Sequence, residues 1–147
     1  MTITELEIFL NEAAADFELI KQDAPIYTVA DGEKYYDINK VAPSLILQSE
    51  KGLILCIVSE NHGRLDFEKT KEKLGFTKLK MADSNKIEAQ TGFKVGTIPL
   101  IGLKIPCILD DKLLKFDYIY GGSGDELTTL KINPNDVKRL NNVIASL

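Results

Sequence analysis

Two apolar runs constrain most strongly how this chain can fold. They span residues 45–47 and 53–58, and residues 49–52 between them (Ser-Glu-Lys-Gly) are typical of a hairpin turn. Both runs are continuously apolar, whereas a strand with one face in water would alternate apolar and polar residues. We therefore expect a hairpin that is covered on both faces by other parts of the chain.

Length and composition fit one domain with a substantial core. The chain has 147 residues, 44% of them hydrophobic, and we expect residues 1–147 to form a single unit. It contains no apolar run of the ~18 residues that a membrane span requires, and its first residues lack the basic region of a signal peptide. Cys56 and Cys107 lie in apolar runs, so we expect buried free thiols and a cytoplasmic protein without a membrane partner.

The charge balance limits the contacts that the chain can make with nucleic acid. Eighteen Lys and Arg residues against twenty-two Asp and Glu residues give a net charge of −4. This balance argues against DNA binding or a broad nucleic-acid surface, but it allows brief contact with the end of an RNA. The lysines of segment 69–80 are interleaved with Glu68 and Glu72, which favours a solvated helix face.

The rest of the chain predicts helices that alternate irregularly with strands. Thr4 and Glu7 match a capping box, and apolar residues at helical spacing continue to Phe17, so we expect a helix over 4–21. The other expected elements are strands 26–29, 78–81, 105–109, 116–120 and 128–132 and helices 66–75, 83–92 and 134–145. This order predicts a mixed α/β (α+β) fold in which helices pack on a mixed sheet.

The loop over residues 91–102 is the segment most suggestive of function. Its sequence, Thr-Gly-Phe-Lys-Val-Gly-Thr-Ile-Pro-Leu-Ile-Gly, has three glycines and a proline among apolar residues and no regular periodicity. One interpretation is a hydrophobic connection beneath a sheet. The other is a binding loop, because glycine lets the backbone approach a ligand and exposed N–H groups can hold a carbonyl or a phosphate.

The side chains offer few other kinds of chemistry. His62 is the only histidine and the two cysteines are far apart in sequence, so we expect no metal and no other cofactor. Residues 121–124 (Gly-Gly-Ser-Gly) precede a strand rather than a helix, which argues against a dinucleotide site. A pair of Ser44 or Ser123 with His62 lacks the nucleophile-elbow pattern. Asp110 ends an apolar strand, where it either faces a cleft or caps a turn.

Four pieces of the sequence, taken in order, resemble the YbaK family, also called the prolyl-tRNA-synthetase-associated or aminoacyl-tRNA editing domain. They are the loop 91–102, the apolar strand 106–110, the aromatic strand and glycine turn 118–124, and the strand and helix start 130–137. Such proteins hydrolyse the ester that joins a wrong amino acid to the 3′ end of a tRNA. The resemblance implies a deacylase acting in trans, with a central mixed, partly curled sheet surrounded by helices. The helix 4–21 would be an addition.

The resemblance also implies which residues form the site. Backbone N–H groups of Gly96, Thr97 and Ile98 would hold the ester and stabilise charge on its carbonyl oxygen, with Asp110 as a further catalytic group. The implied substrate-binding residues are Ser44, Pro99, Gly102, Gly121 and Gly122. The implied partners are the aminoacylated 3′ end of a tRNA and, beyond it, an aminoacyl-tRNA synthetase.

The chain departs from the family pattern at one chemically important position. Family deacylases usually carry a lysine just before a Thr-Leu pair, and here Pro43 occupies that position, followed by Ser44. Proline has neither a charge nor an N–H group with which to anchor a carbonyl or a phosphate. Lys40 lies three positions earlier, about 10 Å away along an extended chain and on its opposite face, which disfavours it as a substitute. Leu100 also stands where many members have a second proline.

Three functions therefore remain open at the level of sequence. The first is a deacylase that relies on backbone donors and on the ribose hydroxyl of its substrate. The second is a non-catalytic member that binds an aminoacyl-tRNA end or a small amino-acid-like ligand. The third is a partner-binding subunit whose apolar loop docks through Leu100 and Ile101.

Overall fold

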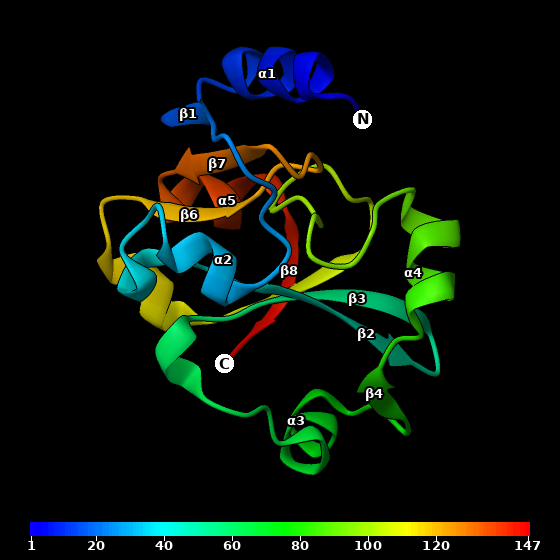
Figure 1. Ribbon diagram of the computed structural model, residues 1–147. Helices are drawn as coiled ribbons and strands as arrows, with labels where there is room; N and C mark the ends of the chain where they lie inside the picture. Colours follow the sequence, from blue (N-terminus) through cyan, green and yellow to red (C-terminus); the bar gives the residue numbers. More distant parts are fainter.

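Two β-sheets organise the chain (Figure 1). The computed structural model describes the backbone of residues 1–147 and every side chain except that of Asn61. The smaller sheet is antiparallel, in the order β1-β7-β6, with β1 at Phe17–Lys21, β6 at Ile119–Gly122 and β7 at Thr128–Ile132. The larger sheet is mixed, in the order β4-β2-β3-β5-β8, with β2 at Ser44–Ser49, β3 at Gly52–Ile57, β4 at Leu79–Met81, β5 at Pro106–Leu109 and β8 at Asn142–Ser146.

Five α-helices and three short 3₁₀ helices accompany these sheets in the part of the chain that the structure describes. The α-helices are α1 at Ile3–Glu12, α2 at Val29–Glu33, α3 at Phe67–Leu74, α4 at Ser84–Thr91 and α5 at Pro134–Leu140. Short 3₁₀ helices occupy Ile38–Lys40 (η1), Glu60–His62 (η2) and Asp111–Lys115 (η3). Figure 1 shows α1 beyond the smaller sheet and α3 beyond the larger one. The predicted mixed α/β fold is confirmed; the second sheet was not predicted, and the partial curl of the central sheet stays a prediction.

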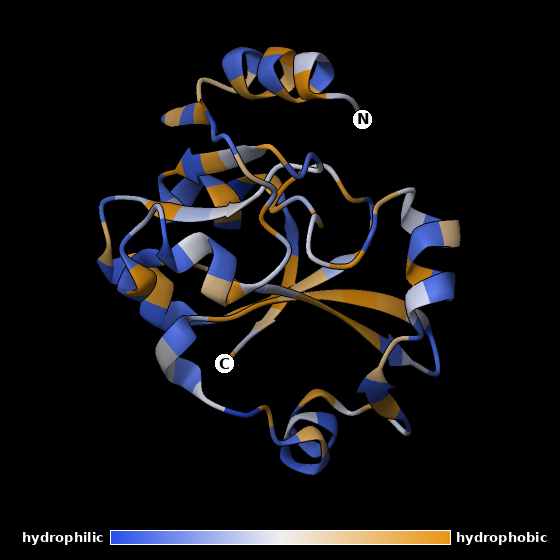
Figure 2. Cartoon of the chain, in the orientation of Figure 1, coloured by the Kyte–Doolittle hydropathy of each residue, from blue (hydrophilic) through white to orange (hydrophobic). Residues whose placement is uncertain are grey.

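The central hairpin is buried on both faces, as its continuous apolarity predicts. Alternate side chains of β3 face opposite ways, so Leu55 and Ile57 join the main core while Ile54 and Cys56 join a second one. The main core takes residues from both sheets and includes Leu6 and Leu10 of α1, and the second core packs against α3. Figure 2 shows β2 and β3 as the most continuously hydrophobic segments of the chain.

The predicted N-terminal helix 4–21 is present, but its capping box is wrong and it ends much earlier than predicted. The capping box is formed by Thr2 and Glu5 rather than by Thr4 and Glu7, and the helix ends at Glu12. Ala14 then adopts a left-handed conformation with φ of 54°, which turns the chain away from the helix. Residues 17–21 instead pair with β7, because this pairing fulfils backbone hydrogen bonds that a local helix signal does not anticipate.

The predicted strand 26–29 is also wrong. Thr28 caps α2 through a capping box with Asp31: the Thr28 hydroxyl accepts from the Asp31 N–H at 3.2 Å. The Thr-x-x-Asp pattern was visible in the sequence, but Ile26, Tyr27 and Val29 matched a strand more simply. The chain here becomes one wall of a cavity.

The last helix is shorter than the predicted 134–145. Asn133 caps it and Pro134 is its first residue, as expected, but it ends at Leu140. The Asn141 side-chain amide donates to the carbonyls of Val137 and Leu100, at 2.9 and 2.8 Å, which closes the helix and ties it to the loop 91–102. The residues that follow form β8, parallel to β5.

Most of the remaining expectations are confirmed. The hairpin, the helices α3 and α4, and the strands β4, β5 and β7 lie where predicted, within the usual uncertainty of element ends. The strand predicted at 116–120 begins later, at Ile119. The residues before it form the 3₁₀ helix η3, which Asp110 caps at its start and Phe116 at its end. Both cysteines are free and buried, and burial raises the pKa of each thiol to about 12.

Candidate active site

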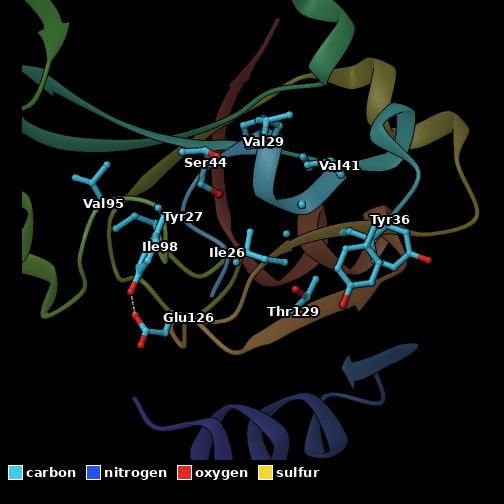
Figure 3. Close-up of a pocket in the computed structure, with 18 of the residues that line it drawn as sticks. Ile26, Tyr27, Val29, Tyr36, Val41, Ser44, Val95, Ile98, Glu126 and Thr129 are labelled. Atoms are coloured by element: carbon cyan, nitrogen blue, oxygen red, sulfur yellow. Dashed lines mark hydrogen bonds between the residues drawn. The ribbon is translucent and has the colours of Figure 1, made fainter. Parts of the chain in front are cut away.

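A cavity of about 260 Å³ lies beside the loop 91–102 (Figure 3). This is close to the lower end of the ~300–1,000 Å³ range of ligand pockets, a size suited to a small group rather than to a macromolecule. Its walls come from α2 and the chain before it, the start of β2, the glycine loop, β6 and the turn into β7. The lining segments are 26–29, 41–45, 95–98 without Thr97, 120–122 and 125–129 without Leu127, with Gly32 and Tyr36.

Two glycines allow the loop to approach the other walls closely. Gly96 has φ of +94°, and a Cβ there would collide with the backbone carbonyl of Tyr27. A Cβ on Gly122 would collide with the carbonyl oxygen of Ile98. The Leu100 N–H also donates to the Gly122 carbonyl at 3.0 Å. The loop is thus held rigidly against β6 by backbone contacts that larger residues would prevent.

Two of the three predicted backbone donors are free. The N–H groups of Gly96 and Ile98 have no hydrogen-bond acceptor among the residues that the structure describes, and both residues line the cavity. The Thr97 N–H instead donates to the Lys94 carbonyl at 3.0 Å, as does the Thr97 hydroxyl at 2.9 Å. Thr97 therefore shapes the turn, and the prediction that its N–H is available is wrong.

The polar side chains of the cavity are few. Ser44 Oγ is buried and has no hydrogen-bond partner within the described part of the chain. On another wall, Glu126 accepts a hydrogen bond from the Tyr27 hydroxyl, which raises the pKa of Tyr27 (Figure 3). Asp125 accepts from the Thr128 hydroxyl at 2.9 Å. No lysine, arginine or histidine is found among the described lining residues, so the cavity has a negative character.

The structure brings together about half of the residues implied by the sequence. Those that line the cavity are Ser44, Gly96, Ile98, Gly121 and Gly122, together with Pro43 at the family lysine position. Those that do not line it are Thr97, Pro99, Gly102 and Asp110. Leu100 and Ile101 are fully buried, so the suggestion that they dock onto a partner is wrong.

Asp110 belongs to a separate buried cluster at the ends of β3 and β5. Its Oδ2 accepts from the Ser59 hydroxyl at 2.6 Å and from the Ser59 N–H at 3.0 Å, and its Oδ1 accepts from the Lys112 N–H at 3.0 Å. His62 Nδ1 lies 3.6 Å from Oδ2, beyond hydrogen-bonding distance, and the His62 side chain is only 22% exposed. His62 is therefore largely enclosed, and Asp110 caps a turn, one of the two roles that its sequence position allows.

Stability should depend on pH through Asp110. Burial alone would raise its pKa, but the hydrogen bonds from Ser59 and Lys112 outweigh burial and lower the pKa below its ordinary value. The unfolded chain then binds a proton more readily, so the stabilisation is complete above pH ~4 and is lost as the pH falls through the lower folded pKa. Urea unfolding of wild type and Asp110→Asn from pH 7 to pH 2.5 should give a stability difference that shrinks below pH ~4; a constant difference would contradict this.

The described side chains provide no activated nucleophile in the cavity. Both thiols are buried and protonated. The Ser123 hydroxyl donates to the Thr128 carbonyl at 2.6 Å, and Ser44 has no base beside it. No group of three or more His, Cys, Asp and Glu side chains within the described structure has an arrangement that would hold a metal. Backbone donors, one hydroxyl and an acidic wall remain as the chemical resources.

Comparison with known proteins shows the family to which the chain belongs. A sequence model of the aminoacyl-tRNA editing domain matches residues 23–140, which include every residue that lines the cavity. The chain belongs to the aminoacyl-tRNA editing domain family. The editing-domain match begins after α1 and β1, so these two elements lie outside it.

Relatives of this editing domain include free-standing proteins and parts of synthetases. The prolyl-tRNA editing protein ProX of Acetoanaerobium sticklandii is 22% identical over 130 residues, covering 86% of this chain and 76% of ProX. The proline–tRNA ligase of Thermosipho melanesiensis is 28% identical over 133 residues, or 88% of this chain but only 23% of the ligase. An uncharacterised Bacillus subtilis protein, YwhH, is 24% identical and covers 68% of this chain and 64% of its own length.

Solved structures confirm the fold of the editing domain. The hypothetical protein APE2540 superposes with a TM-score of 0.85 at 22% identity, covering 97% of both chains. A candidate trans-editing enzyme for prolyl-tRNA synthetase superposes with a TM-score of 0.79 at 22% identity, covering 99% of this chain and 95% of its own. In the part of the chain that the structure describes, no helix is long and apolar enough to cross a membrane.

Several residues that form the walls of the cavity were not predicted from the sequence. Tyr27, Tyr36, Tyr120 and Glu126 all line it, yet none was singled out. The capping box at Thr28 was the one available signal, because a helix there places Tyr27 and Tyr36 at its two ends.

Proposed function

We propose that this protein is an aminoacyl-tRNA deacylase that acts in trans on mischarged tRNA. The observation that carries the proposal is that the N–H groups of Gly96 and Ile98, two residues that line a cavity of about 260 Å³, have no acceptor among the described residues. Hydrolysis of an aminoacyl ester passes through a tetrahedral intermediate whose oxygen becomes negative, and backbone donors fixed in advance stabilise that charge.

The chemistry requires little more from the protein. An aminoacyl ester is already reactive, so positioning the carbonyl and a water molecule supplies much of the acceleration. The ribose hydroxyl next to the ester is a further group that can take part. Because the substrate also carries an α-ammonium group, the carboxylates of Asp125 and Glu126 give the cavity a complementary charge. Because Pro43 occupies the position of the family lysine, a lysine at this position contributes nothing to the chemistry of this cavity.

The substrate class follows from the size of the cavity. A volume of about 260 Å³ admits the amino acid and its ester but not the tRNA, whose folded part must stay outside. An apolar pocket separates amino acids that differ by one methylene by only ~1–3 kcal/mol, so this site rejects bulky side chains more strongly than small ones. Aminoacyl-tRNA is used in the cytoplasm, where we place the protein, and an aminoacyl-tRNA synthetase would be the source of the mischarged substrate.

The direct experiment is a deacylation panel. Purified protein is added to tRNAs mischarged with small amino acids, and release of the amino acid is followed against the buffer rate. We expect release well above buffer for at least one small amino acid. Release at the buffer rate across the whole panel would reject the deacylase.

The replacement of the family lysine by Pro43 favours a second candidate, a non-catalytic member that binds the same aminoacyl end. It predicts no release in that panel, together with stabilisation of the protein by a non-hydrolysable aminoacyl-adenosine amide in a thermal-shift experiment. Absence of both release and stabilisation would reject both candidates.

Ser44→Ala separates binding from stability. The Ser44 hydroxyl is buried without a partner, which costs the free protein about 1 kcal/mol or more. The variant should therefore keep or slightly raise the melting temperature, while kcat/KM for deacylation falls about tenfold because a substrate contact is lost. Ser84→Ala, on the exposed start of α4, is the matched control and should change neither quantity. A destabilised Ser44→Ala variant with normal kcat/KM would contradict this role.

A further inference from the structure

A cluster of tyrosines and lysines adjoins the cavity on the side of β6. Tyr36 and Tyr120 both line the cavity and stack on each other, with ring centroids 4.4 Å apart. Tyr118 packs edge-on against Tyr120 at 5.4 Å. Figure 3 shows Tyr36 at the end of the cavity away from Val95. The cluster is therefore continuous with the wall of the site rather than a separate surface.

Two ammonium groups are held over one ring of this cluster. Lys40 Nζ lies 4.1 Å from the centroid of the Tyr118 ring, and Lys131 Nζ lies 4.2 Å from it. Cation–π attraction of this kind fixes the position of a lysine without neutralising its charge. Neither ammonium pairs with a carboxylate among the described side chains. Neither charge is therefore held in an ion pair, although Glu18 of β1 is the cross-strand neighbour of Lys131 on its other side.

The backbone fixes the two lysines next to each other although they are far apart in sequence. The Ala42 N–H donates to the Tyr120 carbonyl at 2.8 Å, which ties the end of η1, and so Lys40, to β6. Lys131 of β7 is the direct cross-strand neighbour of Tyr120. Tyr118 lies just before β6, and its ring packs edge-on against that of Tyr120.

We propose that the Lys40–Tyr118–Lys131 cluster binds the backbone phosphates of the single-stranded 3′ end of a tRNA while the esterified amino acid occupies the cavity. This inference rests on the proposed function, because it uses the same cavity for the ester. Lysine binds phosphate as a point charge, and aromatic side chains such as Tyr36 offer stacking surfaces for the terminal bases. Lys40 and Lys131 supply positive charge beside the cavity, whereas the cavity itself has Pro43 at the position of the family lysine.

Charge distribution favours a short RNA end over a long nucleic acid. The chain carries a net charge of −4, and the cavity itself contains Asp125 and Glu126, so a polyanion is attracted only locally. The other lysine-rich segment, 69–80, lies on the far side of the larger sheet, around α3 and β4 (Figure 1). There Lys71 already pairs with Glu68 at 3.0 Å.

The test measures binding of a fluorescent single-stranded RNA that ends in CCA, as tRNAs do. Lys40→Gln with Lys131→Gln should weaken binding at low salt at least about tenfold, and should lower the slope of log K against log salt by about 1.4, for two phosphates. The matched control is Lys78→Gln with Lys80→Gln, two exposed lysines of the other segment, which should bind like wild type. Lys40→Arg with Lys131→Arg should retain binding, and thermal unfolding checks that each variant is folded.

Kinetics separates this inference from the proposed function. In the Gln variant, the rise in KM should be larger for aminoacyl-tRNA than for aminoacyl-adenosine, which has no phosphate. A folded Gln variant that binds RNA like wild type, or that loses binding only as much as the Lys78 and Lys80 control, would overturn the inference. An acidic peptide that displaces the RNA at equal charge would also overturn it. Wild-type protein that binds the RNA but hydrolyses neither ester would overturn the proposed function alone.

Discussion

Replacing Gly96 by alanine should lower kcat/KM for deacylation by about 10²–10³-fold, the cost of losing one donor to a developing oxyanion. Gly96 has φ of +94°, and a Cβ would meet the Tyr27 carbonyl, so the loop must move to accommodate alanine. Movement of the loop displaces the free N–H groups of Gly96 and Ile98 from the cavity. Deacylation is measured under single-turnover conditions so that chemistry rather than product release is observed.

The matched control for this variant is Gly92→Ala. Gly92 lies in the same loop and also has a positive φ, of +79°, but a Cβ there would meet nothing. Both variants carry the cost of about 1 kcal/mol for alanine in a left-handed conformation, and only Gly96→Ala disturbs the cavity. Equal loss of activity in the two variants would mean that general destabilisation, not the position of the donors, accounts for the effect.

Replacing Asp110 by asparagine should be the most destabilising conservative change in the chain. Asp110 is fully buried and accepts three hydrogen bonds, so whichever way an asparagine amide is oriented, its NH₂ group faces a donor. We expect a loss of about 2–4 kcal/mol in the free energy of unfolding at pH 7, from hydrogen bonds to a charged acceptor. For a chain of this size the melting temperature should fall by about 5–15 °C.

Asp111→Asn is the control, because Asp111 is exposed and adjacent. Its unfolding free energy should stay within about 0.5 kcal/mol of wild type. Since Asp110 does not line the cavity, the residual activity of folded Asp110→Asn should track the folded fraction. If Asp110→Asn has normal stability but loses far more activity than its folded fraction explains, Asp110 has the catalytic role that the family resemblance implies.

The sequence predicted the centre of the fold better than its ends. The continuous apolarity of β2 and β3 and the caps at Asp66 and Asp83 are local signals, and the elements that they predicted are present. The predictions for residues 17–21 and 142–146 were wrong, because these strands form only by pairing with β7 and β5. Both partners are more than 30 residues away along the chain. A local pattern contains no information on such partners.

The sequence indicates the glycines that line the candidate site, but it does not indicate side-chain contacts between segments that are distant along the chain. Gly96, Gly121 and Gly122 line the cavity because close backbone approach needs glycine, a requirement that the sequence displays. The burial of Asp110 with Ser59 and the position of Lys40 over Tyr118 depend on contacts across the fold. Distance counted along an extended chain disfavours Lys40 as a substitute for the family lysine. The structure places it beside the cavity through the bridge between η1 and β6.

The central claim is that the N–H groups of Gly96 and Ile98 are free and hold the carbonyl of an aminoacyl ester. The most direct measurement is an NMR titration of ¹⁵N-labelled protein with a non-hydrolysable aminoacyl-adenosine amide. We predict that the amide protons of Gly96 and Ile98 exchange rapidly in the free protein, then move downfield and become protected on binding, whereas Thr97 and Gly92 change little. Protected amides at Gly96 and Ile98 in the free protein, or a saturating ligand that leaves both unmoved, would contradict the account.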